Sequence, residues 1–76
     1  MQQRLALSAR ELQVLQHVVE GGTNAEIGVA LGISPRTVQA HVAAAMTKLR
    51  ARSRTHLAVL ALRTRLVPLE PAGPTR

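Results

Sequence analysis

Apolar residues recur at a helical spacing along four segments of the chain, and polar or glycine-containing residues separate these segments. The first segment follows Ser8, and its apolar residues are Leu12, Val14, Leu15, Val18 and Val19. A period near 3.6 residues is typical of an amphipathic helix with one buried face. Ser8 and Glu11 have the spacing of a capping box, in which each side chain bonds the backbone N–H of the other residue. Gly21 and Gly22 interrupt the pattern, so we predict a first helix between Ser8 and Gly21.

A shorter second helix is predicted to start at Thr23, which repeats the capping-box spacing with Glu26, and to end at Leu31. Ile27 and Leu31 are expected to face the core. A helix this short is not stable alone and has to be held by packing. Gly28 lies inside it at a cost of about 1 kcal/mol in helix propensity relative to Ala. We therefore expect the missing side chain of Gly28 to allow close approach of another helix.

The next connection is a short turn with helix signals on both sides. Gly32 stands where a helix ends through a left-handed residue, Ser34 can cap the following helix, and Pro35 suits the first position of that helix. Two helices joined by so short a turn cross steeply, which is the helix-turn-helix geometry. The stretch from Leu31 to Arg52 is therefore predicted to be the centre of the fold.

The third helix, predicted from Pro35 to about Arg50, divides into two faces. One face is an apolar stripe of Val38, Val42, Ala45, Met46 and Leu49. The other face carries small or polar side chains and no acidic residue: Arg36, Thr37, Gln39, Ala40, Ala43, Ala44 and Thr47. The apolar stripe is predicted to be core, which leaves the second face free to contact a partner.

A fourth helix is predicted over residues 54–67, with Ser53 as its N-cap. It is apolar over an unusually wide arc. One side holds Leu57, Leu60 and Ala61, and the other holds Ala58, Val59, Leu62 and Leu66. One small core cannot cover both sides, so the second set predicts contact with another copy of the helix or with another domain.

These elements predict an all-α fold, a four-helix bundle with a central helix-turn-helix, over residues 1–67. At 76 residues the chain is long enough for one domain only. A domain this small has to use most of its apolar residues to build its core. Residues 68–76 contain three Pro and one Gly, which cannot continue a helix, and are predicted to be a disordered tail.

The charge of the chain points to an anionic partner. Ten Lys and Arg stand against four Asp and Glu, giving a net charge of +6, and five of the basic residues lie between Arg36 and Arg54 with no acidic residue among them. A phosphate backbone is the expected partner of such a cluster. Phe, Tyr and Trp are absent, which argues against modules that bind single strands by stacking bases on aromatic rings. Duplex DNA is therefore favoured.

Other classes of function have little support in the sequence. Without cysteine the chain can form neither a disulfide nor a thiolate zinc site, and His17, His41 and His56 are too far apart to suggest a metal site. No set of nucleophile, base and orienting group is recognisable, so we predict no enzyme and no cofactor. No apolar run approaches the roughly 20 residues that span a bilayer, and no signal peptide is recognisable. A cytoplasmic protein without membrane contact is expected.

The order of these signals resembles the LuxR-type, or GerE-like, helix-turn-helix domain of bacterial transcription regulators. Four motifs carry the resemblance: Leu-Ser-x-Arg-Glu, Gly-x-Thr-Asn-x-Glu-Ile, Leu-Gly-Ile-Ser-x-x-Thr-Val-x-x-His, and Lys-Leu followed by Ser-Arg. Together they cover residues 7–54 in register, and the fourth predicted helix matches the last helix of the family in length and place. Departures from the family pattern include Gly28 for a common Ala, Gln39 and Ala43 for frequent Lys or other polar residues, and Arg50 for a frequent Gly.

The resemblance implies a mechanism and a set of contact residues. In the family the third helix enters the major groove of DNA. Carried over by position, the resemblance implies base contacts from Gln39, Ala40 and Ala43, and phosphate contacts from Arg36, Thr37, Lys48, Arg52 and Arg54. Their chemistry agrees in part, since a Gln amide can pair with adenine or meet a phosphate and Ala methyl groups can pack on thymine methyls.

The predicted function is a DNA-binding domain of a transcription regulator that acts as a homodimer, through Ala58, Val59, Leu62 and Leu66, on two half-sites. Family members usually carry a separate regulatory domain, and none is recognisable here. Two alternatives stay open at this point. One is a promoter-recognition module like region four of sigma factors, and the other is a helical protein-interaction module that has lost DNA binding.

Overall fold

The computed structural model describes residues 7–67, and this part of the chain contains four α-helices joined by short turns. They are α1 (Ala9–Val19), α2 (Asn24–Leu31), α3 (Pro35–Leu49) and α4 (Arg54–Arg63), and this part of the chain has no strand. The predicted all-α fold with four helices is confirmed. The predicted tail at residues 68–76 and the first six residues lie outside the described residues.

Each helix begins where its capping residue predicts. Ser8 Oγ accepts the backbone N–H of Glu11 at 3.0 Å, and Glu11 Oε1 accepts that of Ser8 at 3.0 Å. Thr23 and Glu26 form the same reciprocal pair at the start of α2. Ser34 caps α3 with Pro35 in its first turn, and Ser53 caps α4. These local bonds satisfy backbone donors that have no partner within the helix, which fixes the start of each helix.

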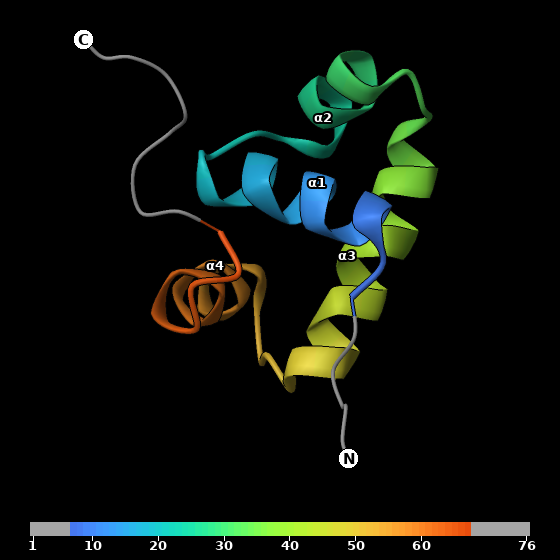
Figure 1. The fold of residues 1–76 in the computed structure, drawn as a ribbon. Coiled ribbons are helices and arrows are strands. Elements are labelled where there is room, and N and C mark those ends of the chain that lie inside the picture. The colour runs from blue at the N-terminus through green and yellow to red at the C-terminus, as the bar shows by residue number, and fades with distance from the viewer. Residues whose placement is uncertain (1–6, 68–76) are drawn as a thin grey trace, which may run out of the picture.

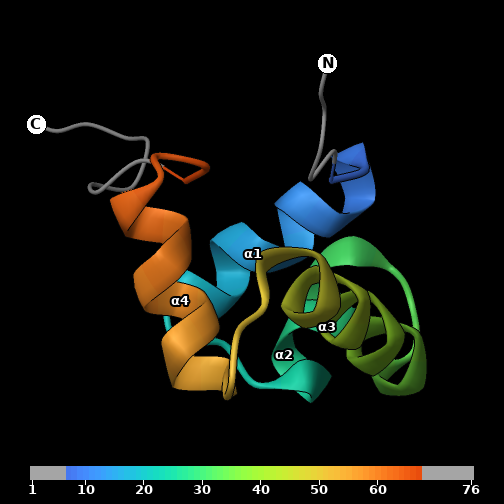
Figure 2. The same cartoon turned by 90° about the horizontal axis from the view of Figure 1, so that it is seen from below.

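α1 is the centre of the bundle. It packs against both α3 and α4, while α2 packs mainly on α3. Figure 1 shows α1 crossing the middle of the molecule, and Figure 2 shows α4 on the left and α3 on the right of the view. α3 and α4 also contact each other. The buried core is entirely aliphatic and comprises Val14, Leu15, Val18, Ile27, Val38, Val42, Ala45, Leu57, Ala61 and Val67. The predicted inner stripe of α3 is confirmed, with Met46 and Leu49 partly buried against this core.

Gly28 allows a close approach, but of the turn and not of a neighbouring helix. A Cβ at this position would lie 2.6 Å from the backbone oxygen of Ile33 and 3.4 Å from the nitrogen of Pro35. The N–H of Ile33 donates to the carbonyl of Gly28 at 2.9 Å. The turn between α2 and α3 therefore folds over the end of α2, which orients α3.

α3 ends in a left-handed residue that is not glycine. Arg50 has φ 58° and ψ 39°, and the following Ala51 donates to the carbonyl of Met46 at 2.9 Å. This is the position where the resemblance expects Gly. The chain thus keeps the usual helix ending with an Arg in a conformation that costs a non-glycine residue roughly 1 kcal/mol.

The prediction that the fourth helix extends to residue 67 is wrong, because α4 ends at Arg63. Arg65 turns into a left-handed conformation with φ 61°, and the N–H groups of Leu66 and Val67 both reach the carbonyl of Ala61. This turn places Val67 in the core with 4% of its surface exposed. A proline disfavours helical geometry at the residue before it, which here is Val67. This restriction and the burial of Val67 together explain the earlier end of α4.

Candidate nucleic-acid interface

The outer face of α3 is open to solvent. Arg36, Thr37, Gln39, Ala40 and Ala43 are all exposed, whereas Val38 and Val42 on the opposite side are buried. The helical period alone separates the two sets, because residues three and four apart share a face. The structure thus brings the predicted base-contacting residues together on one face of α3, a helix that carries no acidic residue.

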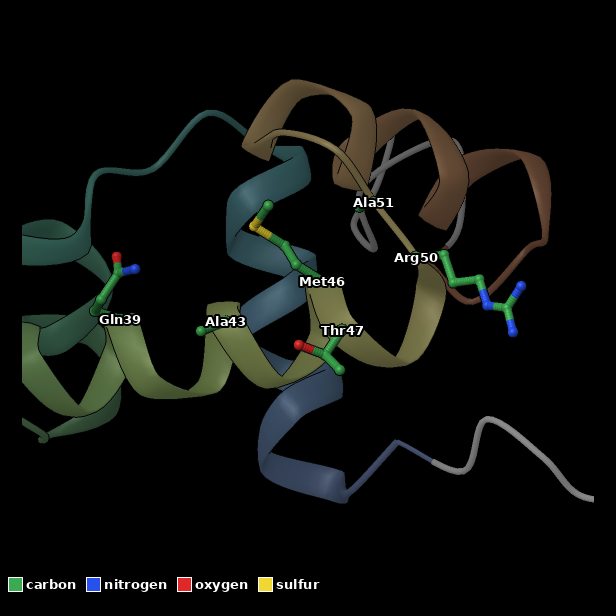
Figure 3. A pocket seen from close by; sticks show the side chains of 6 residues that line it. All are labelled: Gln39, Ala43, Met46, Thr47, Arg50 and Ala51. Atoms are coloured by element: carbon green, nitrogen blue, oxygen red, sulfur yellow. The ribbon is translucent and has the colours of Figure 1, made fainter.

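A shallow hollow runs along the same face. Its lining residues are Gln39, Ala43, Met46, Thr47, Arg50 and Ala51. Figure 3 shows Gln39, Ala43, Thr47 and Arg50 following one another along α3. Arg50 was not among the residues that the resemblance singled out. The sequence did contain a signal for Arg50: it lies eleven residues after Gln39, which is three helical turns, and therefore falls on the same face.

The N-terminal end of α3 is held by a pair of hydroxyl groups. Ser34 Oγ accepts the backbone N–H of Thr37 at 3.0 Å and lies 2.9 Å from Thr37 Oγ1. Both residues are exposed. The start of α3 therefore presents the positive end of the helix dipole, two hydroxyl groups and the nearby Arg36, which is a favourable combination for a phosphate.

Lys48, a predicted phosphate contact, is also part of the bundle. Its Nζ lies 2.8 Å from Oε1 of Glu11, with 38% of the Lys48 side chain and 10% of the Glu11 side chain exposed. The hydrogen bond from Lys48, followed by that from the backbone of Ser8, lowers the pKa of Glu11 against the opposing effect of burial. Lys48 therefore ties α3 to the first turn of α1.

Arg54, another predicted phosphate contact, joins the start of α4 to the start of α2. Its Nη1 donates to Oδ1 of Asn24 at 2.6 Å and its Nη2 to the carbonyl of Gly22 at 2.8 Å. Asn24 in turn donates from Nδ2 to Oε1 of Gln39 at 3.0 Å. Arg52 is exposed, and its backbone N–H donates to Nδ1 of His56 at 2.9 Å.

A comparison with known protein families identifies the chain. The model for bacterial regulatory proteins of the luxR family matches residues 5–61. This chain belongs to that family. The match favours the LuxR-type domain over the sigma-factor alternative, and the chain is a DNA-binding domain of the transcription-regulator type.

Individual relatives agree with the family of this LuxR-type domain. The transcriptional regulatory protein FixJ of Azorhizobium caulinodans is 46% identical over 69 residues, which are 91% of this chain and 33% of FixJ. FixJ of Rhizobium meliloti is 52% identical over 56 residues, 74% of this chain and 28% of that protein. LiaR of Bacillus subtilis is 44% identical over 62 residues, 82% of this chain and 29% of LiaR. The LuxR-type domain thus spans about a third of the length of these curated relatives.

The predicted dimer face of α4 divides into two parts in the LuxR-type domain. Ala58, and Leu66 in the turn that follows α4, pack partly against the core of their own chain. Val59 is 41% exposed, and Leu62 is half-buried. The part of the set that is free for another copy therefore centres on Val59 and Leu62.

Two other features concern membranes and metals. Among residues 7–67, none of the helices combines the length and hydrophobicity needed to cross a bilayer. The same residues hold no cluster of three or more potential metal ligands. His56 has its Nδ1 occupied by the backbone of Arg52, which is a structural role.

Proposed function

We propose that the domain binds duplex DNA by placing α3 in the major groove, with its outer face toward the base edges. One observation carries this proposal: Thr37, Gln39 and Ala40 are exposed side by side on a helix whose other face is buried. The major groove is wide enough to admit an α-helix, and each base pair presents a distinct pattern of donors, acceptors and methyl groups there. A binding role and no catalytic role is proposed for this surface.

The contact residues differ in what else they do. Gln39, Ala40 and Ala43 are proposed to meet base edges, and Arg36, Thr37 and Arg52 to meet phosphates. Lys48 and Arg54 are proposed to contact phosphates in addition to the bonds they make within the domain. Substitution of either one therefore alters the fold as well as binding, so Arg36 is the better residue for a test.

The dependence of binding on salt tests this proposal. With roughly five phosphate contacts, the logarithm of the association constant should fall with the logarithm of salt concentration with a slope of about −4 to −5. Arg36→Ala should weaken binding and reduce the slope by about 1. Arg63→Ala removes the same charge from the exposed end of α4 and is the matched control. A flat response of the unaltered domain would favour the protein-interaction module instead.

We also propose that the domain forms a homodimer through α4, with Val59 and Leu62 at the centre of the contact and Ala58 and Leu66 at its border. The support is the exposure of Val59 on a helix with few charges. Sedimentation velocity measures the oligomeric state, and Val59→Asp should shift the domain to monomer. Val29, 85% exposed on α2, provides the control substitution Val29→Asp. A dimer that survives Val59→Asp would exclude this face.

The relatives support a broader role. We propose that the domain is the DNA-binding part of a cytoplasmic transcription regulator and works with a regulatory domain, because FixJ and LiaR extend well beyond the matched region. The residue boundaries proposed for the domain are 1–67. Limited proteolysis of the chain should leave a fragment that ends close to residue 67 and still binds duplex DNA.

A further inference from the structure

Three side chains from three elements form a chain of hydrogen bonds that ends on the outer face of α3. Arg54 at the start of α4 donates to Asn24 at the start of α2, and Asn24 donates to Gln39 on α3. The bonds measure 2.6 Å and 3.0 Å and join residues 30 and 15 positions apart. We call Arg54, Asn24 and Gln39 the amide relay.

The direction of the amide relay is fixed by the chemistry of Arg54. A guanidinium group has only donors, so the oxygen of the Asn24 amide has to face it. The nitrogen of Asn24 then points the other way, toward Gln39, and this nitrogen can only donate. Gln39 must therefore turn its oxygen toward Asn24. One arginine thus determines the orientation of both amides.

The consequence lies at the exposed end of the relay. Gln39 Oε1 is turned toward Asn24, from which it accepts a hydrogen bond, and Nε2 has no hydrogen-bond partner among residues 7–67. Gln39 also lines the hollow on α3, and Figure 3 shows its amide nitrogen on the side of that hollow. The group that Gln39 offers to a partner is thus an NH₂ donor.

We propose that the amide relay makes Gln39 a donor-only reader in the major groove, which selects a keto base, guanine or thymine, at one position of the DNA site. Guanine presents two acceptors, N7 and O6, and thymine presents O4. Cytosine presents only an amino donor, and adenine presents its N7 acceptor beside an amino donor, so an NH₂ group that approaches adenine N7 also meets the amino group of adenine. The usual pairing of Gln with adenine uses both the oxygen and the nitrogen of the amide. In this domain the oxygen is turned toward Asn24, so it is not aligned for its part of that pairing. This inference rests on the proposed insertion of α3 into the major groove.

The relay also assigns a role to two residues that do not touch the base. For the reading of the base, Asn24 and Arg54 are positioning residues, because they affect it through the orientation of Gln39. Exclusion of water on docking strengthens such hydrogen bonds, so the preference for the orientation grows when DNA covers the surface. Asn24 belongs to the Gly-x-Thr-Asn-x-Glu-Ile motif, and its bond to Gln39 gives this Asn a role at the outer face of α3.

Asn24→Asp tests the relay because it should reverse the orientation of the Gln39 amide while Gln39 itself is kept. The Asp carboxylate still accepts from Arg54 but cannot donate to Gln39. Gln39 must then donate its NH₂ group to Asp and turn its oxygen to the groove. Ala25→Asp, at the next and exposed residue of α2, adds the same charge without entering the relay and is the matched control.

The experiment is selection of bound sites from random duplexes at low salt, carried out with the unaltered domain and with each variant. Gln39→Ala identifies the position that Gln39 reads, because the preference there is lost. At that position we expect the unaltered domain and Ala25→Asp to prefer guanine or thymine, and Asn24→Asp to prefer adenine or cytosine. The preference should be about five- to tenfold in each case, as for one hydrogen bond.

The possible results separate the two levels of the proposal. If the unaltered domain enriches no duplex, the proposed DNA binding itself fails. If the unaltered domain enriches a site but Gln39→Ala changes the preference at no position of it, the relay proposal is overturned. It is also overturned if the unaltered domain prefers adenine or cytosine at the position that Gln39→Ala changes. The same base preference in folded Asn24→Asp also overturns it. Should that variant not fold in a thermal melt, Asn24→Ala replaces it. Asn24→Ala should accept all four bases there, and a retained keto preference would count against the relay.

Discussion

Replacing Lys48 by Met tests how much the ion pair with Glu11 stabilises the domain. The pair spans 37 positions in the sequence and joins the last turn of α3 to the first turn of α1. Met keeps most of the apolar stem of Lys and removes its charge. The buried carboxylate of Glu11 would then keep its bond to the backbone of Ser8 but lose its cation.

The expected cost follows from the burial of the two partners. Removing one partner of a fully buried ion pair costs about 3–5 kcal/mol. Glu11 is nearly buried, but 38% of the Lys48 side chain is exposed, so water weakens the pair. We therefore expect Lys48→Met to lower the free energy of unfolding by about 1–2 kcal/mol. In a domain of this size, the melting temperature should fall by roughly 5–15 °C.

The pH dependence of this effect has a definite sign. The hydrogen bond from Lys48 holds the pKa of Glu11 below its ordinary value of 4.5 in the folded domain. A carboxyl group whose pKa is lower in the folded state stabilises the fold above its unfolded pKa, and loses that contribution as the pH falls through the folded pKa. The difference between the unaltered domain and Lys48→Met should thus be complete at neutral pH and shrink below pH 4.5.

Thermal melts followed by circular dichroism at neutral and acid pH measure both effects. Lys48→Arg, which keeps the charge, is the control and should retain part of the stability. Adding Glu11→Gln to Lys48→Met should recover part of the loss, since Gln can still cap Ser8 without a buried charge. Melting of Lys48→Met within about 2 °C of the unaltered domain at neutral pH, or a difference that persists unchanged in acid, would refute the reasoning.

Three further substitutions test the backbone and the surface, each by thermal melting. Arg50→Gly should stabilise the domain by about 0.5–1 kcal/mol because it relieves the left-handed conformation, whereas Arg50→Ala, which removes the same charge, should not. Gly28→Ala should destabilise it by about 1–3 kcal/mol in spite of better helix propensity, because the new Cβ would clash with the backbone oxygen of Ile33. Val29→Ser should change stability by less than about 0.5 kcal/mol, since Val29 is 85% exposed, and a larger loss would reveal packing that the structure does not show.

The helix starts and the core could be predicted because their causes are local. A capping box needs only four consecutive residues, and the inner stripe of α3 needs only the helical period. The end of α4 was missed because a long-range effect, the burial of Val67, acts together with a local one, the restriction that Pro68 places on Val67, and the two outweigh the apolar pattern of the segment. The apolar pattern of a helix continues over residues 64–67, but the turn after α4 allows Val67 to be buried in the core.

The candidate site was predicted only in part, for a related reason. The exposure of Gln39 and Ala40 follows from the period of α3, and the structure agrees. The partner of Gln39 does not follow from any pattern, because Asn24 reaches it from α2 and is itself bonded by Arg54 from α4. A resemblance carries positions but not the hydrogen bonds between them. The donor character of Gln39 therefore becomes visible only in the folded chain.

The same logic decides how binding data on this domain should be interpreted. Lys48 and Arg54 each lie among the proposed phosphate contacts and each hold two helices together. A loss of DNA affinity on replacing either one combines a lost charge with a displaced helix, so it has to be compared with the change in melting temperature. Arg36 and Ala43 are exposed and make no such bonds within residues 7–67. Substitutions there report on the interface alone, and agreement between the two groups would show that the exposed face of α3 determines binding.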